Sequence, residues 1–382
     1  MRESLKSLAT LVVSSVLCLA VVEGVLRVLP VCSDLEVQAV DASNPIIRFR
    51  PGSEFVFSDG FWLTNANRGH INNFGFVNDQ DYDPDDPRPL LAVIGDSYVQ
   101  ALMVPYGSTV QGRLAAHAAG RRRVYSFGSA GSSLLDYLYY AAYARQHFRP
   151  DWMVINVVGN DFDEMLLRYK ELPAFHYLKE LPDSSLAPIL VEYRPSGIGL
   201  LRRSALARYL VFNIGNASPA VARLLGALHR AAAWLFAPAN AAEPEFVGNT
   251  AATTAPQRIE LSQRAVRYVL DHLAEATGLP PSHVLFLVDS YRIFDPAGLA
   301  SARLSYFGIM RDFLIAEAGG RGYEVVDLQD WFARRHKQDG SVFQFPDDGH
   351  WNPTGHEEAA RAVMASGVYA GFAATSARLA PP

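Results

Sequence analysis

The stretch LLAVIGDSYV, residues 90–99, indicates the fold more clearly than any other part of this chain. Its first five residues are all apolar, which is typical of a strand covered on both faces of a parallel sheet. Ser97 follows directly, just beyond the carboxyl end of the predicted strand, where α/β sheets place their functional groups. The tripeptide Gly-Asp-Ser alone is weak evidence, because all three are ordinary turn residues. Ser97 is therefore a candidate nucleophile that needs support from elsewhere.

Further apolar runs and helical patterns surround this stretch. Strands are predicted at 124–126, 152–158, 284–288 and 323–327, and helices at 109–119, 134–148, 258–276, 299–318 and 353–370. Ser108 is a candidate cap for the first helix, and Gly278 and Gly319 fall where the C-terminal caps of two helices are expected. Strands that alternate with helices predict an α/β fold. We expect a three-layer α/β/α sandwich around a mostly parallel five-stranded sheet.

Composition excludes several classes of protein. The chain has 382 residues, of which 49% are hydrophobic and 19% charged, so it is not intrinsically disordered. Its 34 basic and 39 acidic residues give a net charge of −5, which argues against a nucleic-acid partner. Two cysteines cannot form a disulfide framework or a zinc cluster.

The N-terminus carries a membrane signal. Residues 8–22 contain no charge, and Arg2 and Lys6 precede them. A spanning helix needs about 20 apolar residues and a signal peptide core about 7–15, so both interpretations fit. No small-residue cleavage site is evident, so we favour an uncleaved signal anchor over residues 1–30; a cleaved signal and a buried core helix are the alternatives. The charge distribution predicts that the amino end lies in the cytosol and the body outside it, in the periplasm if the cell is Gram-negative.

The remaining division follows from these elements. We expect an extracytoplasmic lead-in at 31–89, the sheet domain at 90–164 and 258–372, and a tail at 373–382. Residues 165–257 are too long for one crossover. They contain two apolar, Arg-bearing stretches and an Ala/Pro/Thr-rich loop, which predicts a helical insertion that could form a lid.

Other polar residues also follow predicted strands. The second strand leads into a glycine turn that contains Gly128 and Gly131, and the third into Gly-Asn-Asp with Asn160. Near the C-terminus stands Asp-Asp-Gly-His-Trp-Asn, which contains His350. Because the carboxyl ends of parallel strands share one edge of a sheet, these groups can converge on Ser97.

These four blocks resemble those of the SGNH, or GDSL-type, hydrolase superfamily, including its bacterial membrane-anchored esterases and polysaccharide O-acetyltransferases. The resemblance covers about residues 70–165 and 280–370, and Asn72–Phe76 looks like the entry strand of bacterial members. It implies the flavodoxin-like SGNH fold. It also implies that Ser97 is the nucleophile and His350 its general base. The backbone N–H groups of Ser97 and Gly131 and the Asn160 amide would form the oxyanion hole, with Gly128 as an alternative donor.

The acid of the triad is ambiguous. The common family spacing Asp-x-x-His selects Asp347, whereas members with Asp-Gly-His-Trp-Asn select Asp348. We favour Asp348, because the Asp-Gly-His turn can fold its carboxylate back onto the imidazole. A metal site made by Asp347, His350 and His356 is a further possibility, but His356 more readily fits the first turn of the last helix.

The resemblance implies an enzyme that acts on ester bonds without a cofactor or metal. We expect a serine esterase for O-acyl esters, with O-acetyl groups on carbohydrate as the favoured substrate. An O-acyltransferase that works with partners in exopolysaccharide biosynthesis is the first alternative, and a non-catalytic carbohydrate-binding or scaffold protein the second. Lipase and thioesterase activities stay open. The chain has no G-x-S-x-G elbow, Walker A loop or G-x-G-x-x-G motif.

Overall fold

The computed structural model of the protein describes residues 2–195, 203–214, 246–346 and 348–376. The chain divides into two compact units. Unit 1 comprises residues 1–36, 54–69 and 195–240; unit 2 comprises residues 37–53, 70–194 and 241–382. This division differs from the expected lead-in at 31–89, because parts of that segment pack with the sheet and other parts with the N-terminal helix.

Unit 2 is built on a five-stranded sheet whose neighbouring strands are all parallel. The order is β4-β3-β5-β8-β9. The strands are β3 (Leu90–Gly95), β4 (Arg123–Gly128), β5 (Trp152–Val157), β8 (Val284–Val288) and β9 (Glu324–Asp327). Each predicted strand is confirmed to within three residues at either end, and continuous burial along β3, β4 and β8 explains why their sequences do not alternate.

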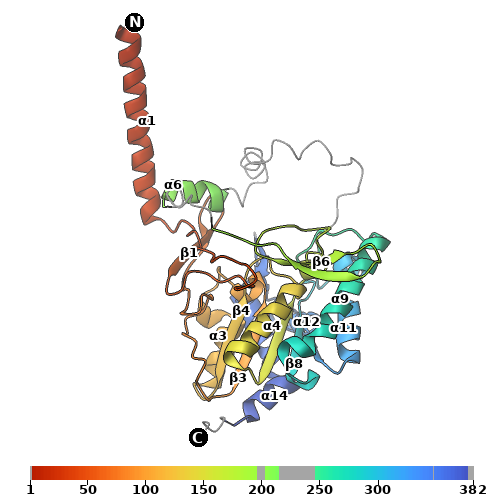
Figure 1. The fold of residues 1–382 in the computed structure, drawn as a ribbon. Helices are drawn as coiled ribbons and strands as arrows, with labels where there is room; N and C mark the ends of the chain where they lie inside the picture. Colours follow the sequence, from red (N-terminus) through yellow and green to blue (C-terminus); the bar gives the residue numbers. More distant parts are fainter. Residues whose placement is uncertain (1, 196–202, 215–245, 347, 377–382) are drawn as a thin grey trace. The chain divides into compact units, whose positions relative to one another are not determined.

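Helices cover both faces of this sheet (Figure 1). Along β3, Leu90, Ala92 and Ile94 pack on the side of α4 (Leu134–Phe148), α9 (Pro256–Thr277) and α11 (Tyr306–Gly320). The residues between them, Leu91 and Val93, pack on the side of α3 (Val110–Ala118), α12 (Leu328–Asp339), α13 (Pro353–Met364) and α14 (Gly367–Ala374). This alternation confirms the predicted α/β/α sandwich.

Two predicted helices are interrupted. The 299–318 pattern is split into α10 (Pro296–Leu304) and α11, and the 353–370 pattern into α13 and α14. Ser305 and Ser366 cause the breaks, because each has an extended backbone and caps the next helix with its side chain. Gly278 caps α9 in the left-handed conformation as expected, whereas α11 runs through Gly319. Thr109, not Ser108, caps α3.

The 165–257 segment is not uniformly helical. Its first part forms an antiparallel hairpin of β6 (His176–Glu180) and β7 (Leu186–Leu190), which belongs to unit 2. Its short helical part, α6 (Ala205–Arg208) and the π-helix Tyr209–Ile214, belongs to unit 1. Residues 196–202 and 215–245, on which much of the lid hypothesis depends, lie outside the described residues.

Unit 1 also holds α1 (Arg2–Val28) and a hairpin of β1 (Glu54–Asp59) and β2 (Thr64–His70), whose last residue lies in unit 2. Within the described residues, a single helix is long and apolar enough to cross a membrane. It is α1, over Glu3–Val28. Asn72–Phe76 is a turn rather than a strand, because the Asn72 side chain accepts backbone N–H bonds from Phe74 and Phe76. The remaining short elements are α2 (Ser97–Gln100), Tyr106–Ser108, Gly159–Asp161, Pro281–His283, β10 (Gln344–Phe345) and β11 (Asp348–Trp351).

Candidate active site

The turn after β3 presents Ser97. The strand ends at Gly95, and Ser97 opens the short helix α2. The buried Asp96 caps that helix, because its Oδ1 accepts the Tyr98 backbone N–H at 2.9 Å. A Cβ at position 95 would lie 2.5 Å from a Val99 methyl carbon, so only glycine allows the chain to turn this tightly. The nucleophile candidate is thus held by a compact strand–turn–helix.

A hydrogen-bonded chain joins Ser97, His350 and Asp348. His350 Nε2 lies 2.7 Å from Ser97 Oγ, and His350 Nδ1 lies 2.5 Å from Asp348 Oδ1. The same Asp348 oxygen accepts the His350 backbone N–H at 3.1 Å. The turn therefore folds the carboxylate back onto the imidazole two residues later, in strand β11. Asp347 lies outside the described residues.

The carboxyl groups of Asp348 and of Asp96, which precedes Ser97, have pKa values shifted in opposite directions. Burial tends to raise the pKa of Asp348, but the hydrogen bond and charge of His350 outweigh it and hold the pKa below its usual value. Burial raises the pKa of Asp96 to about 6. Asp348 is thus ionised at neutral pH and can stabilise a protonated His350, which is what a base next to a serine requires.

Gly131 and Asn160 have neighbours that sequence reasoning missed. Gly131 has a left-handed backbone (φ +83°), and its carbonyl oxygen accepts a hydrogen bond from Lys170 Nζ at 2.6 Å. Lys170 Nζ also pairs with Glu164 at 2.5 Å, and Glu164 accepts a longer bond of 3.4 Å from Asn160 Nδ2. A Lys–Glu pair thus links the two predicted oxyanion donors. Neither residue lies in a recognisable motif.

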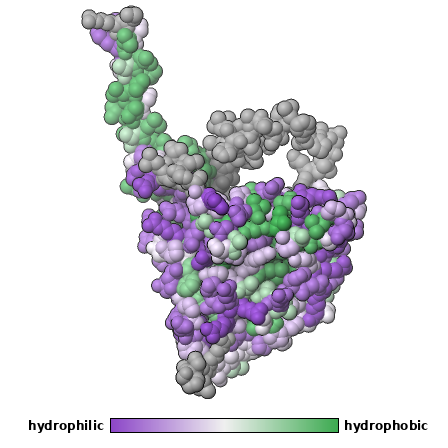
Figure 2. Space-filling view, viewed as in Figure 1, coloured by the Kyte–Doolittle hydropathy of each residue, from purple (hydrophilic) through white to green (hydrophobic). Residues whose placement is uncertain are grey.

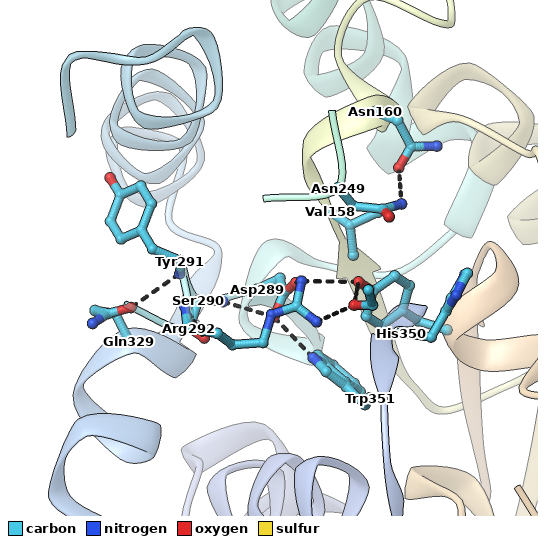
Figure 3. Close-up of polar contacts among 12 residues, drawn as sticks. Val158, Asn160, Asn249, Asp289, Ser290, Tyr291, Arg292, Gln329, His350 and Trp351 are labelled. Atoms are coloured by element: carbon cyan, nitrogen blue, oxygen red, sulfur yellow. Dashed lines mark hydrogen bonds and ion pairs between the residues drawn. The ribbon is translucent and has the colours of Figure 1, made fainter. Parts of the chain in front are cut away.

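Asn249 fixes the orientation of the Asn160 amide. Asn249 Nδ2 donates to Asn160 Oδ1 at 2.8 Å, and Figure 3 shows the two side chains facing each other. With its oxygen engaged, Asn160 keeps its amide N–H groups as the available donors. A backbone hydrogen bond also holds the turn that carries Asn249: the Gly159 N–H donates to the Gly248 carbonyl at 2.7 Å. Asn249 came from the loop expected at the end of the insertion and carried no local signal.

A buried ion pair between Arg292 and Asp289 supports the turn that carries His350. Arg292 pairs with Asp289 at 3.0 Å, and both side chains are almost fully buried. Arg292 also donates to the Gly349 carbonyl, as does the Tyr98 hydroxyl at 2.7 Å. Asp289 accepts the Trp351 indole N–H at 2.9 Å (Figure 3). This network fixes the backbone on both sides of His350.

Several residues near this network have structural roles. Tyr98 and Trp351 are each 1% exposed and pack edge to face, so they support the site rather than line it. Asp161 accepts the Val158 N–H and the Tyr137 hydroxyl, which gives it a local structural role. His356 is buried, accepts the Val110 N–H at 3.3 Å and has its pKa lowered by burial to about 3. No group of three or more potential metal ligands occurs within the described residues.

Comparison with known proteins identifies the family. The model for GDSL-like lipases and acylhydrolases matches residues 91–363, more than half of the chain. The chain therefore belongs to the GDSL-like lipase/acylhydrolase family, whose members act on esters, and it has the SGNH hydrolase fold.

Solved structures similar to this chain include hydrolases and an esterase at low sequence identity. An α/β hydrolase from the metagenome of Lake Arreo is 17% identical (72% of this chain, 94% of that chain, TM-score 0.36). A lipase/acylhydrolase from Enterococcus faecalis is 11% identical (72% and 93%, TM-score 0.35). A mutant acetyl-xylooligosaccharide esterase from Geobacillus is 11% identical (78% and 100%, TM-score 0.36). A search of curated proteins gave no match.

Proposed function

We propose that this protein is a serine esterase that removes O-acyl groups, chiefly O-acetyl groups carried by carbohydrate. The observation that supports the proposal most strongly is the hydrogen-bonded chain from Asp348 through His350 to Ser97. Family membership supports ester chemistry. The choice of acetylated carbohydrate rests on the superfamily resemblance of the sequence.

In the first half of the reaction, Ser97 Oγ bonds to the ester carbonyl carbon while His350 Nε2 accepts its proton. The tetrahedral intermediate collapses when His350 returns that proton to the leaving alcohol, and the acyl group stays on Ser97. Water then attacks the acyl-serine and gives a proton to His350, which returns it to Ser97 as the carboxylic acid leaves. Asp348 remains ionised throughout and stabilises the imidazolium.

The negative charge on the carbonyl oxygen needs preorganised donors. We assign the Ser97 and Gly131 backbone N–H groups and the Asn160 amide to this task. The bond from Asn249 supports this assignment, because it leaves the Asn160 N–H groups rather than its oxygen available to substrate. The 3.4 Å bond to Glu164 is long enough for one N–H to exchange partners when the oxyanion forms.

The acceptor in the second half of the reaction can be water or a sugar hydroxyl. Water as the acceptor makes the protein an esterase, and a sugar hydroxyl makes it an acyltransferase.

We propose that α1 anchors the chain with its amino end in the cytosol and its body outside, where exported polysaccharide would be the substrate.

The test uses the full chain in detergent, an acetylated oligosaccharide as donor and an unacetylated one as acceptor. Mass spectrometry of the products distinguishes free acetate from acetyl groups moved to the acceptor. We expect free acetate from the wild type and none above background from Ser97→Ala. Acetyl transfer to the acceptor that is lost in Ser97→Ala would show that the protein is an acyltransferase and not an esterase. Unchanged turnover in Ser97→Ala would exclude both.

A further inference from the structure

The tip of the β1–β2 hairpin exposes two large aromatic side chains. Phe61 is 59% exposed and Trp62 is 82% exposed, and their rings meet edge to face with centroids 4.9 Å apart. Burial of such an exposed tryptophan ring against a partner would be favourable, because the ring has a large apolar surface. The turn between the strands is nevertheless held firmly, because the Tyr209 hydroxyl donates to the Phe61 carbonyl at 2.9 Å.

This tip is attached to the end of α1. Leu63, next to Trp62, packs on a small cluster formed by Leu26 of α1, Val31 and Ala205 of α6. All of these residues belong to unit 1. The hairpin tip, α6 and the last turns of α1 therefore form one continuous body.

Glu23 strengthens the attachment of α6 to α1. Its carboxylate accepts the backbone N–H groups of Ala205 and Leu206 at 3.0 and 2.9 Å and the Ser204 hydroxyl at 2.8 Å. It thus caps α6 from a different helix, and α6 starts beside α1 in Figure 1.

The level of this attachment along α1 identifies the partner. The uncharged run of α1 ends at residue 22, and Glu23 and the 61%-exposed Arg27 follow it. Charged residues mark the point at which a spanning helix leaves the hydrocarbon and enters the headgroup region. Leu26 and Glu23, which hold the hairpin tip and α6, lie at that boundary. Tryptophan is favoured at this depth of a bilayer, and phenylalanine is common on surfaces that lie in the interface.

The π-helix that continues from α6 adds further apolar surface. Leu210 and Val211 are 43% and 47% exposed, and they directly follow Tyr209, which is bonded to the hairpin tip. We call Phe61, Trp62, Leu210 and Val211 the juxtamembrane patch. We propose that this patch inserts into the lipid headgroup region beside α1, so that unit 1 lies against the bilayer by a second contact besides the helix. The proposal rests on α1 spanning the membrane and is independent of the esterase function.

The test follows the fluorescence of Trp62 in the full chain reconstituted into phosphatidylcholine vesicles. Subtracting the emission of Trp62→Phe from that of the wild type isolates this one residue. We expect this difference emission to be quenched by lipids with bromine near the headgroup end of the acyl chain. Quenching should be weaker with bromine near the methyl end, and iodide in the water should have little effect. Unbrominated vesicles give the reference intensity.

Trp351→Phe provides the matched control, because Trp351 is 1% exposed and bromine cannot touch its ring. Its difference emission should be insensitive to brominated lipid. A Trp62 signal that ignores bromine but is quenched by iodide would place the patch in water and overturn the proposal. A signal shielded from both would mean that protein covers the patch, which also overturns it, as would failure of the chain to float with the vesicles. An unchanged circular dichroism spectrum and thermal unfolding midpoint of Trp62→Phe would show that the variant is folded.

Discussion

At the scale of single residues, the site depends on which carboxylate holds His350. The hydrogen bond of 2.5 Å between His350 Nδ1 and the accepting Asp348 Oδ1 keeps the ring turned so that Nε2 faces Ser97. A Cβ at Gly349 would meet no atom closer than 3.5 Å, so the short loop between Asp348 and His350 does not depend on the glycine. The acid was recognisable from the sequence only as one of two adjacent aspartates.

Asp348→Asn should therefore cripple the enzyme while leaving it folded. An amide can hold the ring in the wrong tautomer, with the proton on Nε2, and the expected loss is up to about 10⁴ in kcat. Steady-state ester hydrolysis measures it. Asp347→Asn is the matched control and should cost far less; a crippling effect of that neighbour would show that Asp347 is the acid.

Asp96 should make the folding stability depend on pH. Its pKa is 3.8 as a free group and about 6 when folded, so the folded state holds the proton more tightly. Stability from this group is therefore complete below pH 3.8 and is lost as the pH rises through about 6. The loss is about 1.4 kcal/mol for each pH unit between the two values.

Asp96→Asn should remove this dependence, because an amide cannot ionise and its oxygen can still cap α2. Thermal unfolding of the full chain in detergent at pH 5 and pH 8 measures the effect. The wild type should lose more stability between the two pH values than the variant. Asp85→Asn, at an exposed position, is the control. Equal pH dependence in wild type and Asp96→Asn would contradict the assigned ionisation.

At the scale of elements, sequence patterns predicted the sheet well and the connections poorly. Strands β3 and β8 were the most recognisable, because their buried residues form unbroken apolar runs. The breaks at Ser305 and Ser366 were missed because a serine within an apolar helical pattern resembles an ordinary interior residue. The β6–β7 hairpin was missed because Pro188 interrupts β7 and the apolar residues around it do not alternate with polar ones. Asn249 was beyond reach, since its partner Asn160 lies 89 positions away.

The turn that carries Asn249 should influence catalysis through Asn160. Asn249 has a left-handed backbone (φ +67°), so Asn249→Gly removes the side chain without adding strain. Asn160→Ala should lower kcat by about 10²–10³. Asn249→Gly should lower kcat less, with little change in KM, because the amide can then rotate away.

The double variant tests whether the two residues act together. If Asn249 acts only through Asn160, Asn249→Gly should have almost no effect in the Asn160→Ala background. Fully additive losses in kcat would show that Asn249 contributes independently, and the positioning role would be wrong.

At the scale of the whole molecule, the residues of the proposed active site and those of the proposed membrane contact lie in different units. Unit 2 contains Ser97, His350, Asp348, Gly131 and Asn160, together with the buried Arg292–Asp289 pair beneath them. Unit 1 contains the apolar helix α1 and the exposed aromatic tip. Figure 2 shows the apolar surface of α1 as a nearly continuous band. We therefore expect substitutions in unit 2 to change the proposed chemistry and substitutions in unit 1 to change the proposed membrane contact.

The role of Ser97 as a nucleophile activated by His350 can be measured with a serine-directed fluorophosphonate probe. Such a probe bonds covalently to an activated serine and displaces fluoride. After labelling of the full chain, peptide mass spectrometry should find the adduct on Ser97, with labelling slowed by orders of magnitude in His350→Ala and absent in Ser97→Ala. An adduct on another serine, or ester cleavage by a chain whose Ser97 stays unlabelled, would contradict the account.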